Sequence, residues 1–312
     1  MKRDFICLTD FSAETLNQLL NLAVRLKKEH KNGVPHRLLQ GKTLGMIFAK
    51  SSTRTRVSFE AGMYQLGGLA LFLSDREIQL GRGESIADTA RVLSRYLDLI
   101  MIRNDSHSEM SAFARHSQIP VINGLSERFH PCQAMADLLT IREIKGDLSR
   151  IKLAYVGDGN NVAHSLLNGC ALFGADISLA SPEEYQVDPV VLRKAKEIAA
   201  QSGSVIRAGT SPEEAVRDAD AVYTDTWISM GQEELKQEKV PVFKDYQVNR
   251  ALMEKAAPDA VFMHCLPAYC GYEVTPEIFE GPASVVFEQA ENRLHVQKAI
   301  MLYTLLGDAC FG

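Results

Sequence analysis

Short apolar runs alternate with longer stretches of helical periodicity along the chain. Eight such runs predict strands, at residues 44–49, 98–102, 119–122, 152–156, 175–180, 220–224, 260–264 and 284–287. Apolar strands separated by amphipathic helices are typical of parallel sheets that are covered by helices on both faces. The pattern therefore predicts an α/β fold, with functional residues at the carboxyl ends of the strands.

Three helices stand out between or after these strands. Ser12 is a suitable N-cap for the first, which ends before Gly33 and carries one apolar stripe, formed by Leu16, Leu19, Leu20, Ala23 and Leu26. Pro131 opens the second, Gly146 follows its end, and its stripe consists of Ala134, Leu138, Ile141 and Ile144. The third spans residues 292–307.

The length of 312 residues favours two domains, because a single hydrophobic core stops growing at roughly 250–300 residues. A polar stretch near residue 147 separates the second helix from the next strand. We expect two doubly wound domains, residues 1–146 and 147–290, with the active site in the cleft between them. We expect residues 291–312 to form a C-terminal helix that packs back on the first domain. Residues 231–245 lack periodicity and predict either a mobile lid or an ordinary surface loop.

Composition narrows the class of protein. The chain is 46% hydrophobic and 23% charged, with a net charge of −5, so nothing favours binding to nucleic acid or to acidic membranes. We expect no membrane span, because no apolar run approaches the ~20 residues of a span. We expect no signal peptide, because the N-terminus has acids at Asp4 and Asp10 and no apolar h-region. The six cysteines form no CxxC pair, as expected for reduced thiols in the cytoplasm. We expect no metal, since no His/Cys cluster has ligand spacing and His264 and Cys265 should point opposite ways on a strand.

Hydroxyl and arginine side chains follow the first predicted strand directly, in the run Ser-Ser-Thr-Arg-Thr-Arg at 51–56. A helix start supplies unpaired backbone N–H groups and partial positive charge. Ser52, Thr53 and Thr55 add hydroxyl groups, and Arg54 adds a bidentate guanidinium. We interpret the run as a site for a phosphate-sized dianion. The alternative is a surface turn with two solvated arginines.

Polar clusters follow five other predicted strands or open a helix. They are Arg103, the run 130–133 (His-Pro-Cys-Gln), the run 157–161 (Gly-Asp-Gly-Asn-Asn), the run 225–231 (Asp-Thr-Trp-Ile-Ser-Met-Gly) and the run 264–267 (His-Cys-Leu-Pro). Clusters at several carboxyl ends suggest one common site. The run 157–161 lacks the G-x-G-x-x-G spacing of a dinucleotide site.

These motifs resemble those of the aspartate/ornithine carbamoyltransferase family. The Ser-x-Arg-Thr-Arg run at 52–56 resembles its carbamoyl phosphate loop, and the His-Pro-x-Gln motif at 130–133 is shared with its aspartate branch. The Ser-Met-Gly run at 229–231 and the His-Cys-Leu-Pro run at 264–267 resemble its ornithine branch. The resemblance covers essentially the whole chain. It departs at 268–271, where Ala-Tyr-Cys-Gly replaces the Ala-His-Arg-Gly of many relatives, so no basic residue is expected in that loop.

The resemblance implies transfer of the carbamoyl group of carbamoyl phosphate to the δ-amine of L-ornithine, giving L-citrulline and phosphate. No cofactor is implied, and the step belongs to arginine biosynthesis or to a urea-cycle type of pathway. The implied catalytic residues are Arg103, His130 and Cys265. The implied carbamoyl phosphate ligands are Ser52, Thr53, Arg54, Thr55, Gln79, Arg103, His130, Gln133, Cys265, Leu266 and Arg293. The implied ornithine ligands are Asn161, Asp225, Ser229 and Met230.

The resemblance also gives roles to individual residues. Arg103 and His130 would stabilise the oxyanion, and a helix start would keep the His130 imidazole neutral. Cys265 would orient the amine or accept its proton, with the leaving phosphate as a competing acceptor. Arg293 would lie near the start of the last helix, where a cation is favourable only beside an anion. The loop that contains Gln79 and Arg82 would reach the active site of a neighbouring subunit in a homotrimer or a multiple of trimers.

Other functions remain open at this point. The acceptor could be putrescine, an acylated ornithine or aspartate, although aspartate would require arginines for its second carboxylate. A nicotinamide-dependent oxidoreductase could use a similar sheet, and a non-catalytic relative could merely sense anions. A cofactor titration or an assay of ureido products separates these classes.

Overall fold

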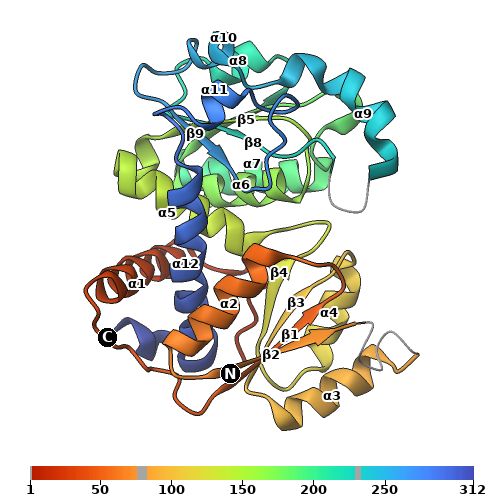
Figure 1. The fold of residues 1–312 in the computed structure, drawn as a ribbon, viewed down its shortest axis with the longest axis vertical. Coiled ribbons are helices and arrows are strands. Elements are labelled where there is room, and N and C mark those ends of the chain that lie inside the picture. The colour runs from red at the N-terminus through yellow and green to blue at the C-terminus, as the bar shows by residue number, and fades with distance from the viewer. Residues whose placement is uncertain (1, 76–82, 229–232) are drawn as a thin grey trace. The chain divides into compact units, whose positions relative to one another are not determined.

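The computed structural model describes residues 2–75, 83–228 and 233–312 (Figure 1). It divides into two compact units, one formed by Met1–Ala136 with Glu291–Gly312 and the other by Asp137–Ala290. The division falls inside a helix, earlier than the change in composition near residue 147. The C-terminal segment belongs to the first unit.

The first unit contains a four-stranded parallel sheet in the order β2-β1-β3-β4. Its strands are β1 (Thr43–Phe48), β2 (Leu69–Ser74), β3 (Leu99–Arg103) and β4 (Val121–Leu125). Its helices include α1 (Ala13–Lys31), α2 (Thr53–Gln65), α3 (Ile86–Tyr96) and α4 (His107–His116). α5 (Pro131–Lys145) begins in this unit, and α12 (Val286–Leu306) ends in it. α3 and α4 cover one face of the sheet, and α1, α2 and α12 lie on the other (Figure 1).

The second unit contains a five-stranded parallel sheet in the order β7-β6-β5-β8-β9. Its strands are β5 (Lys152–Val156), β6 (Asp176–Ala180), β7 (Ile206–Gly209), β8 (Ala221–Thr224) and β9 (Val261–His264). The helices are α6 (Asn161–Phe173), α7 (Pro189–Ser202), α8 (Pro212–Val216), α9 (Lys236–Phe243), α10 (Arg250–Met253) and α11 (Pro276–Phe279). α6 and α7 lie on one face of the sheet, and α8, α10 and α11 on the other (Figure 1).

The predicted α/β class is confirmed, and seven of the eight predicted strands correspond to β1, β3, β4, β5, β6, β8 and β9. The prediction of a strand at 284–287 is wrong. Ser284 makes one isolated bridge with Phe262, and α12 starts at Val286. A four-residue apolar run is compatible both with a strand and with the first turn of a buried helix, so the run alone does not distinguish the two. β2 and β7 were missed, and both are edge strands with partly exposed side chains.

The helix ends follow their local sequence. The Ser12 hydroxyl accepts a hydrogen bond from the Thr15 N–H at 3.1 Å, which confirms the predicted cap of α1. Gly146 follows α5 with a φ of 90°, a conformation that favours glycine. The predicted apolar stripe of α5 is buried at Ala134, Leu138 and Ile141, but Ile144 is exposed. None of the helices among the described residues is long and apolar enough to cross a membrane.

Candidate active site

The first unit has a helix start at the point where the sequence predicts an anion site. β1 ends at Phe48, and Ser52 caps α2 by accepting a hydrogen bond from the Thr55 N–H at 3.3 Å. Thr53 and Arg54 therefore occupy the first turn, where backbone N–H groups and the helix dipole favour negative charge. Thr55 is fully buried beneath them.

Two buried arginines reach the same region from other elements. Arg103 is the last residue of β3, at a point where the register with β4 shifts. Arg293 extends from α12, and its Nη2 donates to the Thr55 Oγ1 at 2.8 Å. The expectation that Arg293 lies near the start of its helix is wrong, because α12 begins at Val286, about two turns earlier. Its position is explained by the contact with Thr55 of α2 rather than by the dipole of α12.

His130 lies among these arginines. Its pKa is lowered well below the usual range, first by burial and then by Arg293, Arg103 and Arg54. The imidazole is therefore neutral at physiological pH, as predicted. The cause differs from the prediction, which invoked helix N–H groups. Gln133, in the first turn of α5, is also buried.

This part of the first unit suits a small dianion. Three guanidinium groups act on one buried imidazole, and none of the described residues that shift its pKa is acidic. The predicted ligands Ser52, Thr53, Arg54, Thr55, Arg103, His130, Gln133 and Arg293 all belong to this unit. Cys265 and Leu266 belong to the second unit, and Gln79 lies outside the described residues.

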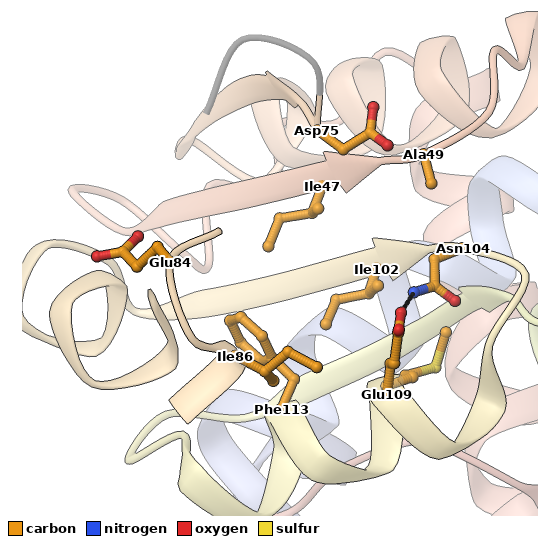
Figure 2. A pocket seen from close by; sticks show the side chains of 10 residues that line it. Ile47, Ala49, Asp75, Glu84, Ile86, Ile102, Asn104, Glu109 and Phe113 are labelled. Atoms are coloured by element: carbon orange, nitrogen blue, oxygen red, sulfur yellow. Dashed lines mark hydrogen bonds between the residues drawn. The ribbon is translucent and has the colours of Figure 1, made fainter. Parts of the chain in front are cut away.

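A separate cavity of about 210 Å³ opens beside β1 and β3 in the same unit (Figure 2). Ile47, Ile102 and Phe113 form part of its apolar wall. Asp75, Glu84 and Glu109 contribute carboxyl groups, and the Asn104 Nδ2 donates to the Glu109 Oε2 at 3.1 Å (Figure 2). Since carboxylates repel a dianion, this cavity is not the anion site.

The second unit places a buried carboxylate, Asp225, directly after β8. The Asp225 Oδ1 accepts hydrogen bonds from the Thr226 N–H at 2.8 Å and from the Cys265 thiol at 2.9 Å. The Asp225 Oδ2 accepts from the Asn160 Nδ2 at 2.7 Å. A carboxylate held in one orientation by three donors is suited to a cationic ligand.

Cys265 is a protonated thiol in this arrangement. Burial raises its pKa well above the usual range, and the adjacent Asp225 raises it further. A thiol with a raised pKa donates a hydrogen bond and does not serve as a base. The structure thus brings Cys265 and Asp225 together, as predicted, and favours a donor role for the sulfur.

The turn after Cys265 is held by a buried pair that the sequence analysis missed. Leu266 has a φ of 61°, which is strained for a leucine. Its N–H donates to the His264 Nδ1 at 2.8 Å, so the other ring nitrogen carries the proton and donates to the Glu273 Oε1 at 3.2 Å. The same oxygen accepts from the Tyr269 N–H at 2.6 Å. Nine residues separate His264 from Glu273, and no local pattern indicates their contact.

Asn161 is the first residue of α6, but its neighbour Asn160 is the cap. The Asn160 Oδ1 accepts from the N–H groups of Val162 and Ala163 at 2.9 and 3.2 Å. These two donors are thus already occupied, which leaves less of the helix start for a substrate carboxylate than expected. Ser229 and Met230 lie outside the described residues.

The segment 233–246 is helical rather than irregular, since it contains α9 between two short 3₁₀ turns, Glu233–Leu235 and Lys244–Tyr246. The buried Lys239 of α9 forms an ion pair with the partly buried Asp158, with the Nζ 2.6 Å from the Oδ2. This pair ties α9 to the loop after β5. No local sequence pattern indicates this pair, because its partners are far apart along the chain.

Asp225, His264 and Cys265 could in principle hold a metal, because one ligand atom of each lies within 4.8 Å of the others. The expectation that His264 and Cys265 point apart is therefore wrong. However, both ring nitrogens of His264 are used, by Leu266 and Glu273. The donor set fits a metal poorly unless the turn opens.

Two family models match the chain, one in each half. A family model described as the carbamoyl-P binding domain of aspartate/ornithine carbamoyltransferase matches residues 3–143. A second, described as the Asp/Orn binding domain of the same enzymes, matches residues 149–304.

Individual relatives are similar over nearly their full length. An ornithine carbamoyltransferase of Bacillus subtilis is 58% identical over 96% of this chain and 92% of its own. An anabolic ornithine carbamoyltransferase of Pyrococcus furiosus is 52% identical over 98% and 97%. Among solved structures, ornithine carbamoyltransferase from Pyrococcus furiosus has a TM-score of 0.94 at 52% identity, covering 96% of each chain. The anabolic enzyme from Campylobacter jejuni has a TM-score of 0.92 at 46% identity, covering 97% and 99%.

Proposed function

Because the chain belongs to the aspartate/ornithine carbamoyltransferase family, we propose that it transfers the carbamoyl group of carbamoyl phosphate to the δ-amine of L-ornithine. The products are L-citrulline and phosphate. The observation that carries this proposal is the cluster of Arg54, Arg103 and Arg293 around a neutral His130. It lies in the half of the chain that matches the carbamoyl phosphate domain.

The donor is bound by the first unit. Arg54, Arg103, Arg293 and the start of α2 bind the phosphate group, with Ser52, Thr53 and Thr55 contributing hydroxyl groups. Arg103 and the neutral His130 donate to the carbonyl oxygen as it becomes an oxyanion, and Gln133 contacts the carbamoyl amide. Loss of one such donor typically costs about 10²–10³ in rate.

The acceptor is bound by the second unit. Asp225 attracts an ammonium group, assisted by Ser229, while Asn161 and the backbone of Met230 bind the α-carboxylate. Cys265 and Leu266 contact the reacting groups. The side chain of Asp225 accepts from Thr226, Asn160 and Cys265, and none of these partners is an arginine that could bind a second carboxylate. This favours ornithine over aspartate.

The chemical step forms a bond from the δ-nitrogen to the carbonyl carbon and breaks the bond from that carbon to the phosphate oxygen. The attacking amine must first lose a proton. An amine with a pKa of about 10.4 costs about 3 kcal/mol to neutralise at pH 8. Since the pKa of Cys265 is raised, its thiol holds its own proton, and the leaving phosphate is the better acceptor for the proton lost by the amine.

A nicotinamide site is disfavoured by the loop after β5. A Cβ on Gly159 would lie 2.4 Å from the Val187 nitrogen, so this glycine serves packing within the unit. Asp158 adds a partly buried carboxylate paired with Lys239.

We further propose a homotrimer, or a multiple of trimers. Support comes from an exposed apolar surface on the first unit. The edge strand β2 exposes Leu69 and Leu71, and α2 exposes Val57 and Tyr64, with Tyr64 78% exposed. Such surfaces and open edges are typical of subunit contacts. Light scattering on the purified protein tests the stoichiometry.

We also propose a cytoplasmic enzyme of arginine biosynthesis. The six cysteines are free thiols, as expected in a reducing compartment. Two relatives, from Pyrococcus furiosus and Campylobacter jejuni, are named anabolic.

An assay of ureido product tests the function directly. The purified chain is incubated with carbamoyl phosphate and, in turn, with ornithine, putrescine, aspartate and acetylornithine. We expect product with ornithine alone. Product with another acceptor would transfer the proposal to that acceptor, and no product with any of them would overturn carbamoyl transfer.

A further inference from the structure

Helix α2, whose start forms the anion site, is held by α12 at three points along its length. At its start, the Arg293 Nη2 donates to the Thr55 Oγ1 at 2.8 Å. At its end, the Lys298 Nζ donates to the Gln65 Oε1 at 2.9 Å. Both contacts come from the same helix, α12, and both lie within the first unit.

Between these contacts the two helices approach closely at Gly62. A Cβ on Gly62 would lie 3.2 Å from the Lys298 Cγ and 3.2 Å from the Met301 Cε. It would also lie 3.5 Å from the Leu294 Cδ1. A Cβ at this position would require the Lys298 and Met301 side chains to shift by a few tenths of an ångström, so glycine suits the close contact beside Lys298.

Lys298 itself is fully buried and has polar neighbours on several elements. Besides Gln65 of α2, its Nζ lies 3.1 Å from the His36 Nε2. An ammonium group only donates, so the His36 Nε2 accepts and its Nδ1 carries the proton. That Nδ1 lies 3.2 Å from the Glu29 Oε2 of α1. On its own helix, Lys298 faces the buried His295, whose pKa it lowers.

Burying an ammonium group here costs desolvation free energy. A methionine of similar length would fill the same space without desolvating a charge. What methionine cannot supply is a directional bond to the end of α2. Two directional contacts, one at each end, fix both the position of α2 along its axis and its rotation. Displacing reactive groups by about 1 Å can cost 10²-fold in rate.

We propose that Lys298 is a positioning residue for carbamoyl phosphate, acting through α2 and Gln65 on the anion site at the opposite end of the helix. The inference rests on the proposed function, since it assigns Lys298 to the donor half of that reaction. Lys298 does not touch the substrate.

The test compares Lys298→Met and Gln65→Leu with the wild type in steady-state kinetics, each with both substrates varied. We expect each variant to raise the KM for carbamoyl phosphate about 10-fold while the KM for ornithine changes less than 2-fold. Gln65→Glu keeps an acceptor for Lys298, and we expect it to retain the wild-type KM for both substrates.

Thr304→Val is the matched control. Thr304 is buried on the same helix, but its Oγ1 donates to the Met301 carbonyl of α12 at 3.0 Å. We expect this variant to lose some stability without a change in either KM. If Lys298→Met does not fold, the KM values of Gln65→Leu alone decide whether the inference holds.

The inference is overturned if Gln65→Leu leaves the KM for carbamoyl phosphate within 2-fold of wild type. It is also overturned if both substrates are affected equally, or if Thr304→Val produces the same selective effect. Failure of the proposed function would appear differently, as a wild-type protein that forms no ureido product.

Discussion

Replacing Lys298 by methionine should change how the stability of the protein depends on pH. The Lys298 side chain is fully buried, and burial lowers its pKa from 10.5 to about 8, with Glu29 opposing the shift. A lysine whose folded pKa is lowered destabilises the folded state, because the unfolded chain binds the proton more tightly. The destabilisation is complete below pH 8 and is lost as the pH rises toward 10.5.

The magnitude follows from the shift. Each pKa unit is worth about 1.4 kcal/mol, so the buried ammonium lowers the free energy of unfolding by roughly 3 kcal/mol at pH 7, of which about 1 remains at pH 10. Methionine removes this term at every pH. It also leaves Gln65 and His36 without their partner, at a cost of about 1–3 kcal/mol for each buried group. The two losses total about 2–6 kcal/mol against a gain of roughly 3 kcal/mol at pH 7, so the difference between two pH values is the informative quantity.

Urea unfolding followed by circular dichroism, at pH 7 and pH 10, measures this quantity. We expect the free energy of unfolding of the wild type, minus that of Lys298→Met, to increase by roughly 2 kcal/mol from pH 7 to pH 10. Groups common to both proteins, including the cysteines and tyrosines, cancel in the comparison. Parallel pH profiles for the two proteins would refute the reasoning, because they would mean that Lys298 keeps its proton as easily in the folded chain as in the unfolded one.

Three further predictions concern the reaction. Arg54→Ala should weaken carbamoyl phosphate binding about 10- to 100-fold, since it removes charge-assisted hydrogen bonds, and unchanged affinity in calorimetry would contradict the anion site. Cys265→Ala should raise the KM for ornithine about 10-fold with carbamoyl phosphate affinity nearly intact, whereas equal losses would make the thiol structural. The rate should climb from neutral to alkaline pH as the δ-ammonium loses its proton, and a flat profile from pH 6 to 9 with rate-limiting chemistry would argue against this.

The fold class was predictable because the strands of both sheets are buried on both faces. β5 and β9 contain the buried apolar runs 153–156 and 261–263, and polar side chains such as Asp158 and His264 follow these runs, so both the strand positions and their functional ends were visible. The missed and wrongly predicted strands are those whose sequences do not follow this pattern. β7 alternates between partly and fully exposed residues at a sheet edge, and the apolar run at 284–287 leads into α12 instead of a strand.

The candidate site was partly predictable for a related reason. Arg54, Asp225 and Cys265 each follow a strand, and the carboxyl ends of parallel strands share one edge of a sheet. The residues that support them were not predictable. Asn160, Glu273 and Lys239 are polar residues without a local pattern, and the bonds of Lys239 to Asp158 and of Asn160 to Asp225 cross long stretches of sequence.

Sequence alone determined the alternation of strands and helices, the helix caps and the residue types that gather at strand ends, because these depend on neighbours within a few positions. Tertiary structure alone decided the protonation of the key groups and the position of α2. The pKa of His130 is lowered first by burial and then by three arginines, which come from α12, β3 and α2. Lys298 meets Gln65 near Gly62, where two helices approach closely. Electrostatic shifts and close packing depend on distances in space, and separation along the chain does not specify those distances.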